Sequence, residues 1–281
     1  MEWLTEHKLP IGSWARWGVD WLTDNASGFF DAISVAIEWL IDSVLWVLQA
    51  PHPLGVVVIV TGLAFVVRRS IPFTLFVALS LLLIINQGYW DETTETLALI
   101  LSSTFVCMLI GVPVGVYSAH HPKFFSWVRP VLDLMQTIPT FVYLIPALIL
   151  FGLGVVPGLI STVVFALPAS IRLTQIGVAS TPKHLLEAGE AFGATYWQKL
   201  FKIELPYAKP NIMVGLTQTI MLSLSMVVIA ALVGADGLGV PTLRALNTVN
   251  IARGFEVGIA IVLIAIVLDR FFKKSEEKGG N

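Results

Sequence analysis

Charge and sulfur are both scarce in this chain of 281 residues. Only 13% of the residues are charged, whereas 56% are hydrophobic. A water-soluble domain of this length could not cover so much apolar surface with so few charges, so the composition excludes a soluble protein and indicates a bilayer protein. The single cysteine, Cys107, lies in an apolar run. This excludes a disulfide framework and a cysteine pair for redox chemistry or zinc binding.

Several motifs of catalysis and energy conversion are also missing. The chain has no Gly-Lys dipeptide, which excludes a P-loop and an ATP site of its own. We find no acid in the middle of the core hydrophobic spans, so a proton relay of the kind that secondary pumps use lacks its residues. His120 and His121 are adjacent, which is not a metal-ligand spacing, and we expect both to be solvated. The sequence therefore predicts a protein that is not an enzyme and binds no metal or cofactor.

Long hydrophobic runs are what the chain has in abundance. A helix needs about 20 mostly apolar residues to cross a bilayer, and we count seven such runs, the first of them short. Their expected ranges are 54–67, 71–86, 94–118, 131–152, 156–178, 211–234 and 255–271. The sequence thus predicts an all-α, polytopic membrane protein with about seven transmembrane helices.

Basic residues are unevenly distributed among the loops. If seven spans alternate, most of them fall on one side, which the positive-inside rule assigns to the cytoplasm. These residues are Arg68, Arg69, Lys123, Arg129, Lys183, Lys199, Lys202, Lys209, Lys273, Lys274 and Lys278. The opposite side is rich in acids, such as Asp91 and Glu92. We predict a multi-pass protein of a bacterial or archaeal cytoplasmic membrane, with its N-terminus outside and its C-terminus in the cytoplasm.

Residues 29–49 are a further apolar stretch, but they contain three acids. Asp31, Glu38 and Asp42 share one helical face, opposite a stripe that includes Ile37 and Ile41. Because acids are costly at the bilayer centre, we favour an amphipathic helix in the outer interface over a span. If this segment did span the membrane, the N-terminus would lie inside.

A polar island, residues 180–210, separates two of the hydrophobic runs. Thr181 is a suitable N-cap and Pro182 suits the first position of a short helix. Gly193 can end that helix in a left-handed conformation. The sequence therefore predicts a first short helix from Pro182 to the turn at Gly193.

A second helix is expected to follow at once. Thr195 and Gln198 have the spacing of a capping box, and we expect the helix to end by Leu205-Pro206, because proline lacks the donor that a continuing helix needs. On the first helix, the small residues Ala188 and Gly189 would let another backbone approach closely. The island is therefore expected to dock a partner, and the alternative is an amphipathic loop resting on its own membrane surface.

The same island resembles the EAA motif of ABC-importer permeases, whose cytoplasmic coupling helix sits in a groove of the ATPase subunit. The matching positions are Glu187, Ala188, Gly189, Gly193, Ile203, Leu205 and Pro206. Gly189 is the one departure, because many members have a second alanine there. The resemblance implies that these residues, together with the apolar Phe192, couple the chain to an ATPase.

The resemblance extends from about Tyr89 to Asp269. Segments 132–148, 165–177 and 224–239 look like the permease subunit of glycine betaine, proline betaine and choline importers of the OpuA/ProU type. Such a permease forms a homodimer with two ATP-binding subunits and a substrate-binding protein on the outer side. The resemblance implies that ATP and Mg²⁺ bind to the partner ATPase, and that nucleic acid is not a partner.

These observations divide the chain into four regions. We expect an N-terminal region with an in-plane helix on the outer side, a pair of accessory spans, a permease core that includes the island, and a cytoplasmic tail. Their ranges are 1–53, 54–88, 89–272 and 273–281.

Two prolines suggest where substrate passes. Pro139 and Pro146 lie seven residues apart in one expected span, where they bend the helix and free backbone carbonyls. Broken spans often line transport pathways, and aromatic faces attract quaternary ammonium ions. Ordinary helix packing is the alternative. The candidate path residues are Met135, Gln136, Thr137, Pro139, Phe141, Tyr143 and Pro146.

Other interpretations stay open from the sequence alone. We expect Arg172, near the cytoplasmic end of its span, to snorkel toward water, with an ion pair to Glu187 or Asp133 as the alternative. The predicted function is an ATP-driven permease for quaternary-ammonium osmolytes. The competing functions are an ion-driven secondary transporter and a membrane scaffold that recruits a soluble protein.

Overall fold

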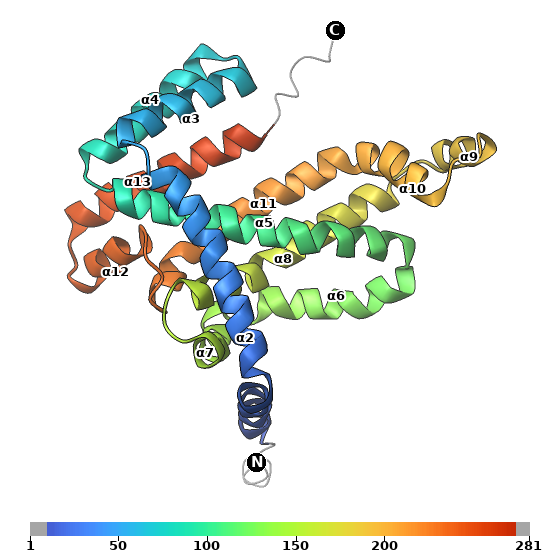
Figure 1. Cartoon of the computed structure of the whole chain (residues 1–281), viewed down its shortest axis with the longest axis horizontal. Coiled ribbons are helices and arrows are strands. Elements are labelled where there is room, and N and C mark those ends of the chain that lie inside the picture. The colour runs from blue at the N-terminus through green and yellow to red at the C-terminus, as the bar shows by residue number, and fades with distance from the viewer. Residues whose placement is uncertain (1–9, 274–281) are drawn as a thin grey trace, which may run out of the picture.

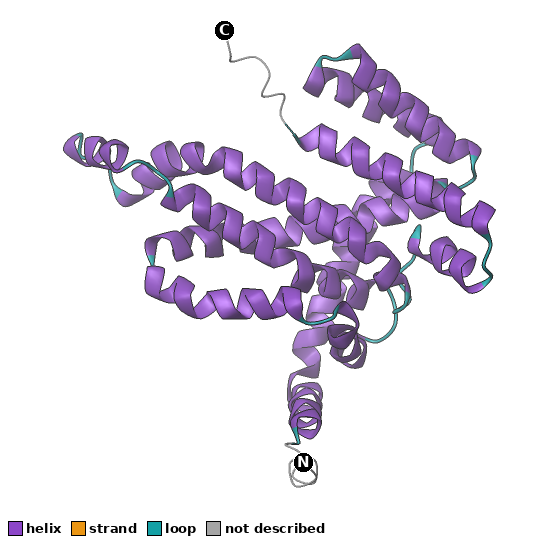
Figure 2. Cartoon of the chain, turned by 180° about the vertical axis from the view of Figure 1, so that it is seen from behind, coloured by secondary structure: helices purple, strands orange, loops and turns teal. Residues whose placement is uncertain are grey.

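The structure is a computed structural model that describes residues 10–273. Nearly all of the expected tail 273–281, with Lys274 and Lys278, lies outside this range. Within the described residues every regular element is a helix, as Figure 2 shows. The predicted all-α class is therefore confirmed.

Three long helices form the centre of the bundle. The long helices α5 (Trp90–His120), α8 (Val155–Ala179) and α11 (Leu205–Ala231) pack closely, with α8 against both of the others (Figure 1). On the other side α8 contacts α6 (Pro122–Thr137). Seen from behind in Figure 2, α11, α8 and α6 lie side by side. This rear layer carries Leu205 and Pro206 of the predicted coupling residues and Met135, Gln136 and Thr137 of the predicted path residues.

Small residues bring these helices together. Gly111 and Gly115, one turn apart on α5, face Ser170 and Thr174 of α8, and a Cβ atom at Gly115 would lie 2.6 Å from the Thr174 Cβ. Helices in membranes associate through such close backbone contacts, because lipid provides no hydrophobic driving force between them. The spacing of small residues therefore sets the α5–α8 contact.

The C-terminal helices close the bundle. The short α12 (Gly239–Asn247) leads into α13 (Ile251–Phe272), and both pack against α11. The Thr96 hydroxyl accepts a hydrogen bond of 2.8 Å from the backbone N–H of Leu238, which ties the start of α12 to α5. The apolar core lies where these helices meet, around fully buried residues such as Leu99 and Ile220.

The N-terminal third adds one long helix and a hairpin. Helix α2 (Ile11–Gln49) is kinked at Ala26 and lies across the front of the bundle in Figure 1, against α5, α7 and α8. The hairpin of α3 (Pro53–Arg68) and α4 (Ile71–Asn86) packs mainly on itself and leans on α13.

The predicted amphipathic stripe of α2 is present, but it packs on protein. Ile41 is only 4% exposed and joins the main core, with Ile37 and Val44 packed beside it. The acids of the opposite face are exposed. The apolar face therefore covers the helix bundle, whereas we expected it to rest in the membrane interface; whether the helix spans or lies in the plane stays a prediction.

The expected span 131–152 is not one helix. It is divided between α6, which ends at Thr137, and α7 (Thr140–Phe151), and the two helices are bent by 96°. Ile138 is extended and Pro139 has no N–H to continue the ladder, so α6 stops before the proline. Pro139 therefore breaks the span and Pro146 lies inside α7, whereas we expected both to bend one helix.

The number of membrane crossings differs from a simple count of hydrophobic runs. Four helices of the described chain are long and apolar enough to cross a membrane: α5, α8, the continuous helix Tyr196–Ala231 and α13. The number rises to six if the bent pairs α2–α3 and α6–α7 each form one span, and α4 is a shorter apolar helix. The count of seven stays a prediction.

Candidate functional site

The polar island forms a knob that projects from one end of the bundle, at the right of Figure 1. Its first helix, α9 (Lys183–Ala191), begins one residue later than expected. Pro182 is extended and occupies the N-cap position, and the Thr181 hydroxyl is buried without a hydrogen-bond partner among the described residues. The predicted cap at Thr181 is therefore wrong, because Pro182 is itself extended and the helix starts only after it.

Gly193 ends α9 as predicted. Its φ is +71°, and its N–H donates to the Glu190 carbonyl while the Ala194 N–H donates to the Gly189 carbonyl. This pair of bonds is a Schellman motif, which requires a left-handed residue that glycine adopts without strain. The chain therefore turns sharply here and begins its second helix within two residues.

The second helix starts with the predicted capping box. The Thr195 N–H donates to the Gln198 side chain at 2.8 Å, and the Gln198 N–H donates to the Thr195 hydroxyl at 3.4 Å. Helix α10 (Tyr196–Lys199) then passes into a π-helical turn, η1 (Leu200–Glu204). Both hydrogen bonds of the capping box are thus formed within the knob.

The helix does not end at Leu205-Pro206, contrary to our expectation. It continues through η1 into α11, so that Tyr196–Ala231 is one 36-residue helix. In η1 the Leu205 N–H already bonds to the carbonyl of Leu200, five residues back, so the regular ladder is interrupted just where Pro206 lacks a donor. The knob is therefore continuous with a core helix.

The predicted coupling residues divide into two groups. Glu187, Ala188, Gly193 and Pro206 are exposed, and Phe192 is 92% exposed. Other aromatic side chains of the knob, such as Trp197, are exposed as well, and a group of exposed aromatic side chains is typical of a protein contact. This group can meet a partner.

The other group holds the knob together. Gly189 is buried, and a Cβ atom there would lie 2.7 Å from the Ile203 Cδ1 atom. Its small size therefore makes room for Ile203 inside the knob, whereas we expected it to admit a partner's backbone. Ile203 and Leu205 are half-buried. These three residues position the exposed ones.

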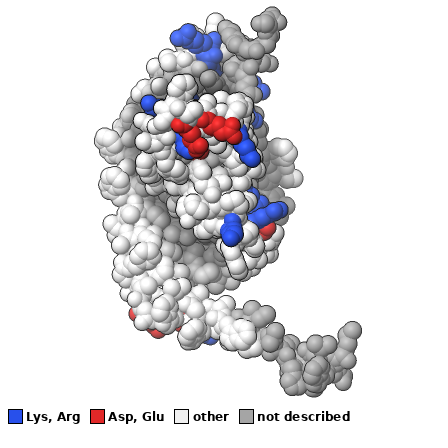
Figure 3. All heavy atoms as spheres, turned by 90° about the vertical axis from the view of Figure 1, so that its right-hand side faces the viewer, with Lys and Arg blue, Asp and Glu red and all other residues white. Residues whose placement is uncertain are grey.

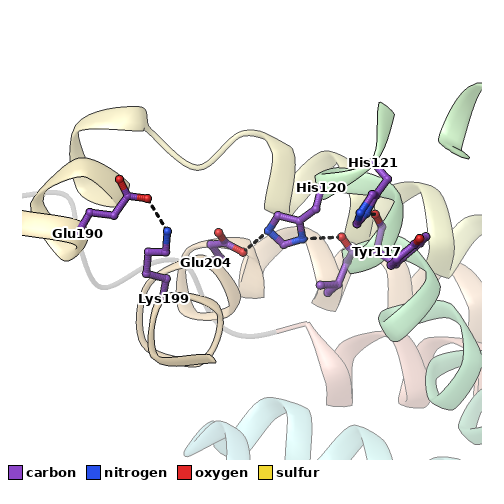
Figure 4. Close-up of polar contacts among 7 residues, drawn as sticks. Tyr117, His120, His121, Glu190, Lys199 and Glu204 are labelled. Carbon is purple, nitrogen blue, oxygen red and sulfur yellow. Dashed lines mark hydrogen bonds and ion pairs between the residues drawn. The ribbon is translucent and has the colours of Figure 1, made fainter. Parts of the chain in front are cut away.

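Two ion pairs fasten the knob, as Figure 4 shows. Lys199 on α10 binds Glu190 on α9, with nitrogen and oxygen 2.5 Å apart. At the base, His120 at the end of α5 contacts Glu204 in η1, with Nε2 2.8 Å from the carboxylate. The other ring nitrogen, Nδ1, lies 3.0 Å from the Val116 carbonyl and donates to it, because a carbonyl oxygen can only accept.

We expected His120 to be solvated, and this prediction is wrong. Its side chain is 25% exposed and that of Glu204 is 9% exposed, whereas His121 is exposed and stacks on Tyr117. The contact with Glu204 is favourable when Nε2 also carries a proton, since both ring nitrogens then donate. It joins α5 to the turn at which the knob meets α11.

The predicted path residues all lie at the break between α6 and α7. Met135 and Gln136 are half-buried near the end of α6, and Thr137, Pro139 and Phe141 are exposed across the break. Tyr143 and Pro146 follow on α7, both half-buried. The break thus presents polar, aromatic and backbone groups together, which a continuous helix would not.

An ion pair lies in the same region, and the sequence analysis had given it only as an alternative. Arg172 on α8 binds Asp133 on α6, with Nη2 and Oδ1 2.5 Å apart. Asp133 is near the start of the expected span 131–152, so the absence of acids from the middle of the core spans stays a prediction, and for Arg172 the alternative ion pair with Asp133 is present. The signal in the sequence was the polar spacing of Arg129, Asp133 and Gln136 on one face of α6.

The described residues contain no group of three or more His, Cys, Asp or Glu side chains placed to hold a metal ion. The chemistry that the site offers is noncovalent: an exposed docking tip, a helix that carries it into the bundle, and a broken helix with a charged pair beside it.

Comparison with known proteins decides the family. The model of the family described as binding-protein-dependent transport system inner membrane component matches residues 111–278, more than half of the chain. The chain belongs to this family. The matched range includes the knob, the α6–α7 break and the Asp133–Arg172 pair.

Relatives of this inner membrane component match over nearly its whole length. The glycine betaine/carnitine transport permease protein GbuB of Listeria monocytogenes is 43% identical, over 96% of each chain. The glycine betaine transport system permease protein OpuAB of Bacillus subtilis is 42% identical, also over 96% of each. The glycine betaine/proline betaine permease ProW of Escherichia coli is 39% identical, over 93% of this chain and 74% of ProW.

A solved structure supports the same architecture for this inner membrane component. A chain of the MetNI methionine ABC transporter, in an inward-facing conformation, aligns with a TM-score of 0.57 and 25% identity. The alignment covers 63% of this chain and 89% of that chain. The predicted ABC-importer permease fold is therefore confirmed.

Proposed function

We propose that this chain is the permease subunit of an ATP-driven importer for quaternary-ammonium osmolytes such as glycine betaine. Three relatives whose names include glycine betaine transport are 39 to 43% identical over at least 93% of the chain. Their agreement over so much of the sequence supports a shared substrate class. In this role the chain forms the translocation path.

Coupling to an ATPase is the function that the geometry of the knob supports best. The main observation is that the exposed tip at Phe192 belongs to a knob whose second helix continues through the π-helical turn η1 into α11. A push on the tip would therefore move a core helix as well as a surface loop. ATP and Mg²⁺ would bind to that separate ATPase, and this chain would bind neither.

The remaining partners follow from the same proposal. A substrate-binding protein would deliver substrate on the outer side, and a second copy of this chain would complete the path. The Glu187-to-Pro206 end would face the cytoplasm. Figure 3 looks onto this end, where Lys and Arg are spread around a compact acidic group, which supports the cytoplasmic side. The N-terminus would then lie outside.

Reconstitution tests the function directly. The chain is placed in liposomes with its ATPase and its binding protein, and uptake of labelled glycine betaine is measured. We expect uptake only when ATP and both partners are present. Uptake driven by an ion gradient without the ATPase would support a secondary transporter. Recruitment of a soluble protein without any uptake would support a scaffold.

Substitution of Phe192 tests whether the tip of the knob contacts the ATPase. Replacing it with alanine (Phe192→Ala) removes an exposed aromatic contact and should weaken association with the ATPase by about tenfold or more. Stability should not change, because the side chain is 92% exposed. Co-purification and ATP hydrolysis measure the effect.

The matched control for Phe192→Ala is Phe29→Ala. Phe29 is 64% exposed and lies on α2, away from the knob. Phe29→Ala should leave association with the ATPase unchanged. If both variants behave alike, the knob is not the ATPase contact.

A further inference from the structure

Helix α6 has three distinct faces, and this division locates the Asp133–Arg172 pair. One face, with Val128 and Leu132, packs inward; Leu132 is 2% exposed. A second face is apolar and exposed, with Trp127 and Leu134 81% and 56% exposed. A helix in a membrane turns such a face toward lipid or an apolar partner. Asp133 lies on neither of these faces.

The third face of α6 is polar. Arg129, Asp133 and Gln136 follow one another at helical spacing, and the Asp133 side chain is 54% exposed. Asp133 is the twelfth residue of α6, about 16 Å along the helix from its start, and Arg172 lies about 10 Å from the end of α8. Charges at this depth are stable only where water or a polar partner meets them. The exposed polar face of α6 is therefore expected to meet water or polar groups.

The pair has unused bonding capacity. Arg172 gives Asp133 one hydrogen bond, and its Nε is buried without a partner among the described residues. A guanidinium can hold a carboxylate through two parallel bonds, and a carboxylate can neutralise a cation that has no N–H to donate. The pair therefore presents one positive and one negative group side by side, with the Arg172 and Asp133 side chains 33% and 54% exposed.

We propose that Asp133 and Arg172 form a station in the translocation path for zwitterions that carry a quaternary ammonium and a carboxylate. The substrate carboxylate binds Arg172 and the ammonium group faces Asp133. This proposal rests on the proposed transport function and names the substrate chemistry that the path accepts.

The exchange of partners explains how such a station passes its substrate on. Each charged group of the pair leaves its protein partner and binds the opposite charge of the zwitterion, so the net gain in binding free energy is small. Passage requires binding that is favourable enough to enter and weak enough to leave. When the zwitterion moves on, the pair closes again between α6 and α8.

Neutral variants test the station in the reconstituted complex. Asp133→Asn and Arg172→Gln should each lower ATP-dependent uptake of glycine betaine by about tenfold, as expected for the loss of one charge-assisted contact. Binding-protein affinity and ATP hydrolysis stimulated by the loaded binding protein should persist. Arg253→Gln, an exposed arginine on α13, is the matched control and should transport normally.

The double variant Asp133→Asn/Arg172→Gln separates a station from a structural tie. Its two amides can still bond to each other and hold α6 against α8. A station predicts that the double variant stays impaired at normal thermal stability. Recovery of uptake in the double variant, or normal uptake in both single variants, would overturn the proposal. If the unaltered complex itself shows no ATP-dependent uptake, the proposed function fails instead.

Thiol labelling tests the position of the station independently. Cys107 is fully buried, so an added cysteine is the accessible target. With a trimethylammonium-bearing thiol reagent, Gln136→Cys should react and Leu134→Cys, on the apolar face, should not. Glycine betaine should slow the labelling of Gln136→Cys, and Asp133→Asn should remove this protection. Absence of protection in the otherwise unaltered chain would contradict a station here.

Discussion

Single residues at the base of the knob hold it to the bundle. His120 bridges two elements, since one ring nitrogen binds the last turn of α5 and the other faces the buried Glu204 in η1. A carboxylate that is 9% exposed needs such a partner, because a buried charge without one is costly. This contact was not foreseen, because the two residues are far apart in the sequence and only the fold brings them together.

His120→Ala should therefore destabilise the protein. It leaves Glu204 buried without a partner, which costs about 1–3 kcal/mol and should lower the melting temperature in detergent by several degrees. Differential scanning fluorimetry measures this shift.

The neighbouring His121 provides the control for that experiment. It is exposed and stacks on Tyr117, so His121→Ala should change stability little. Equal shifts for the two histidines would show that the contact with Glu204 does not stabilise the knob.

At the scale of elements, the π-helical turn η1 sets the direction of the knob. A π turn contains one residue more than the α turn it replaces, so it accommodates that residue without the rotation of α10 relative to α11 that an extra α-helical residue would cause. The sequence predicted the Gly193 turn and the Thr195 capping box correctly, because these depend on hydrogen bonds between near neighbours, but it placed the first N-cap wrongly at Thr181. It did not predict η1, since the proline at 206 alone indicates a stop.

Deleting Phe201 should convert η1 into a regular α turn. The α turn has one residue fewer, so the knob should keep its orientation relative to α11. We expect both membrane insertion and ATP-dependent uptake to persist. Uptake into proteoliposomes and the yield of inserted protein are the measurements.

Phe201→Ala is the control for register. Phe201 is 61% exposed, so the substitution keeps the turn and removes only its side chain. It should retain most of the uptake. Loss of uptake in the deletion variant, with uptake retained by Phe201→Ala, would show that η1 does not accommodate an extra residue in this way.

At the scale of the whole molecule, α2 covers the bundle. Ile41 reaches the main core, which joins the N-terminal region to the permease core. The acid-bearing face of α2 points away from the bundle. Acids in lipid are costly, so this outward face is expected to meet water or headgroups.

A pair of lysine substitutions tests this arrangement. Ile41→Lys buries a charge in the core and should cost several kcal/mol, enough to abolish folded protein. Val35→Lys lies on the exposed acidic face and should be tolerated. Yield and gel-filtration profile in detergent distinguish the two. Loss of folding in both would mean that the outward face of α2 is not wet.

Local sequence determined the class and the caps of this protein. The excess of apolar residues made it a helical membrane protein, and the Gly193 turn and the Thr195 box follow from bonds between residues a few positions apart. Tertiary structure alone decided that the knob continues into α11 and that the small size of Gly189 makes room for the Ile203 side chain. It also chose Asp133 as the partner of Arg172, 39 residues away. Such choices depend on how helices pack, and helix packing joins residues that are distant in the sequence.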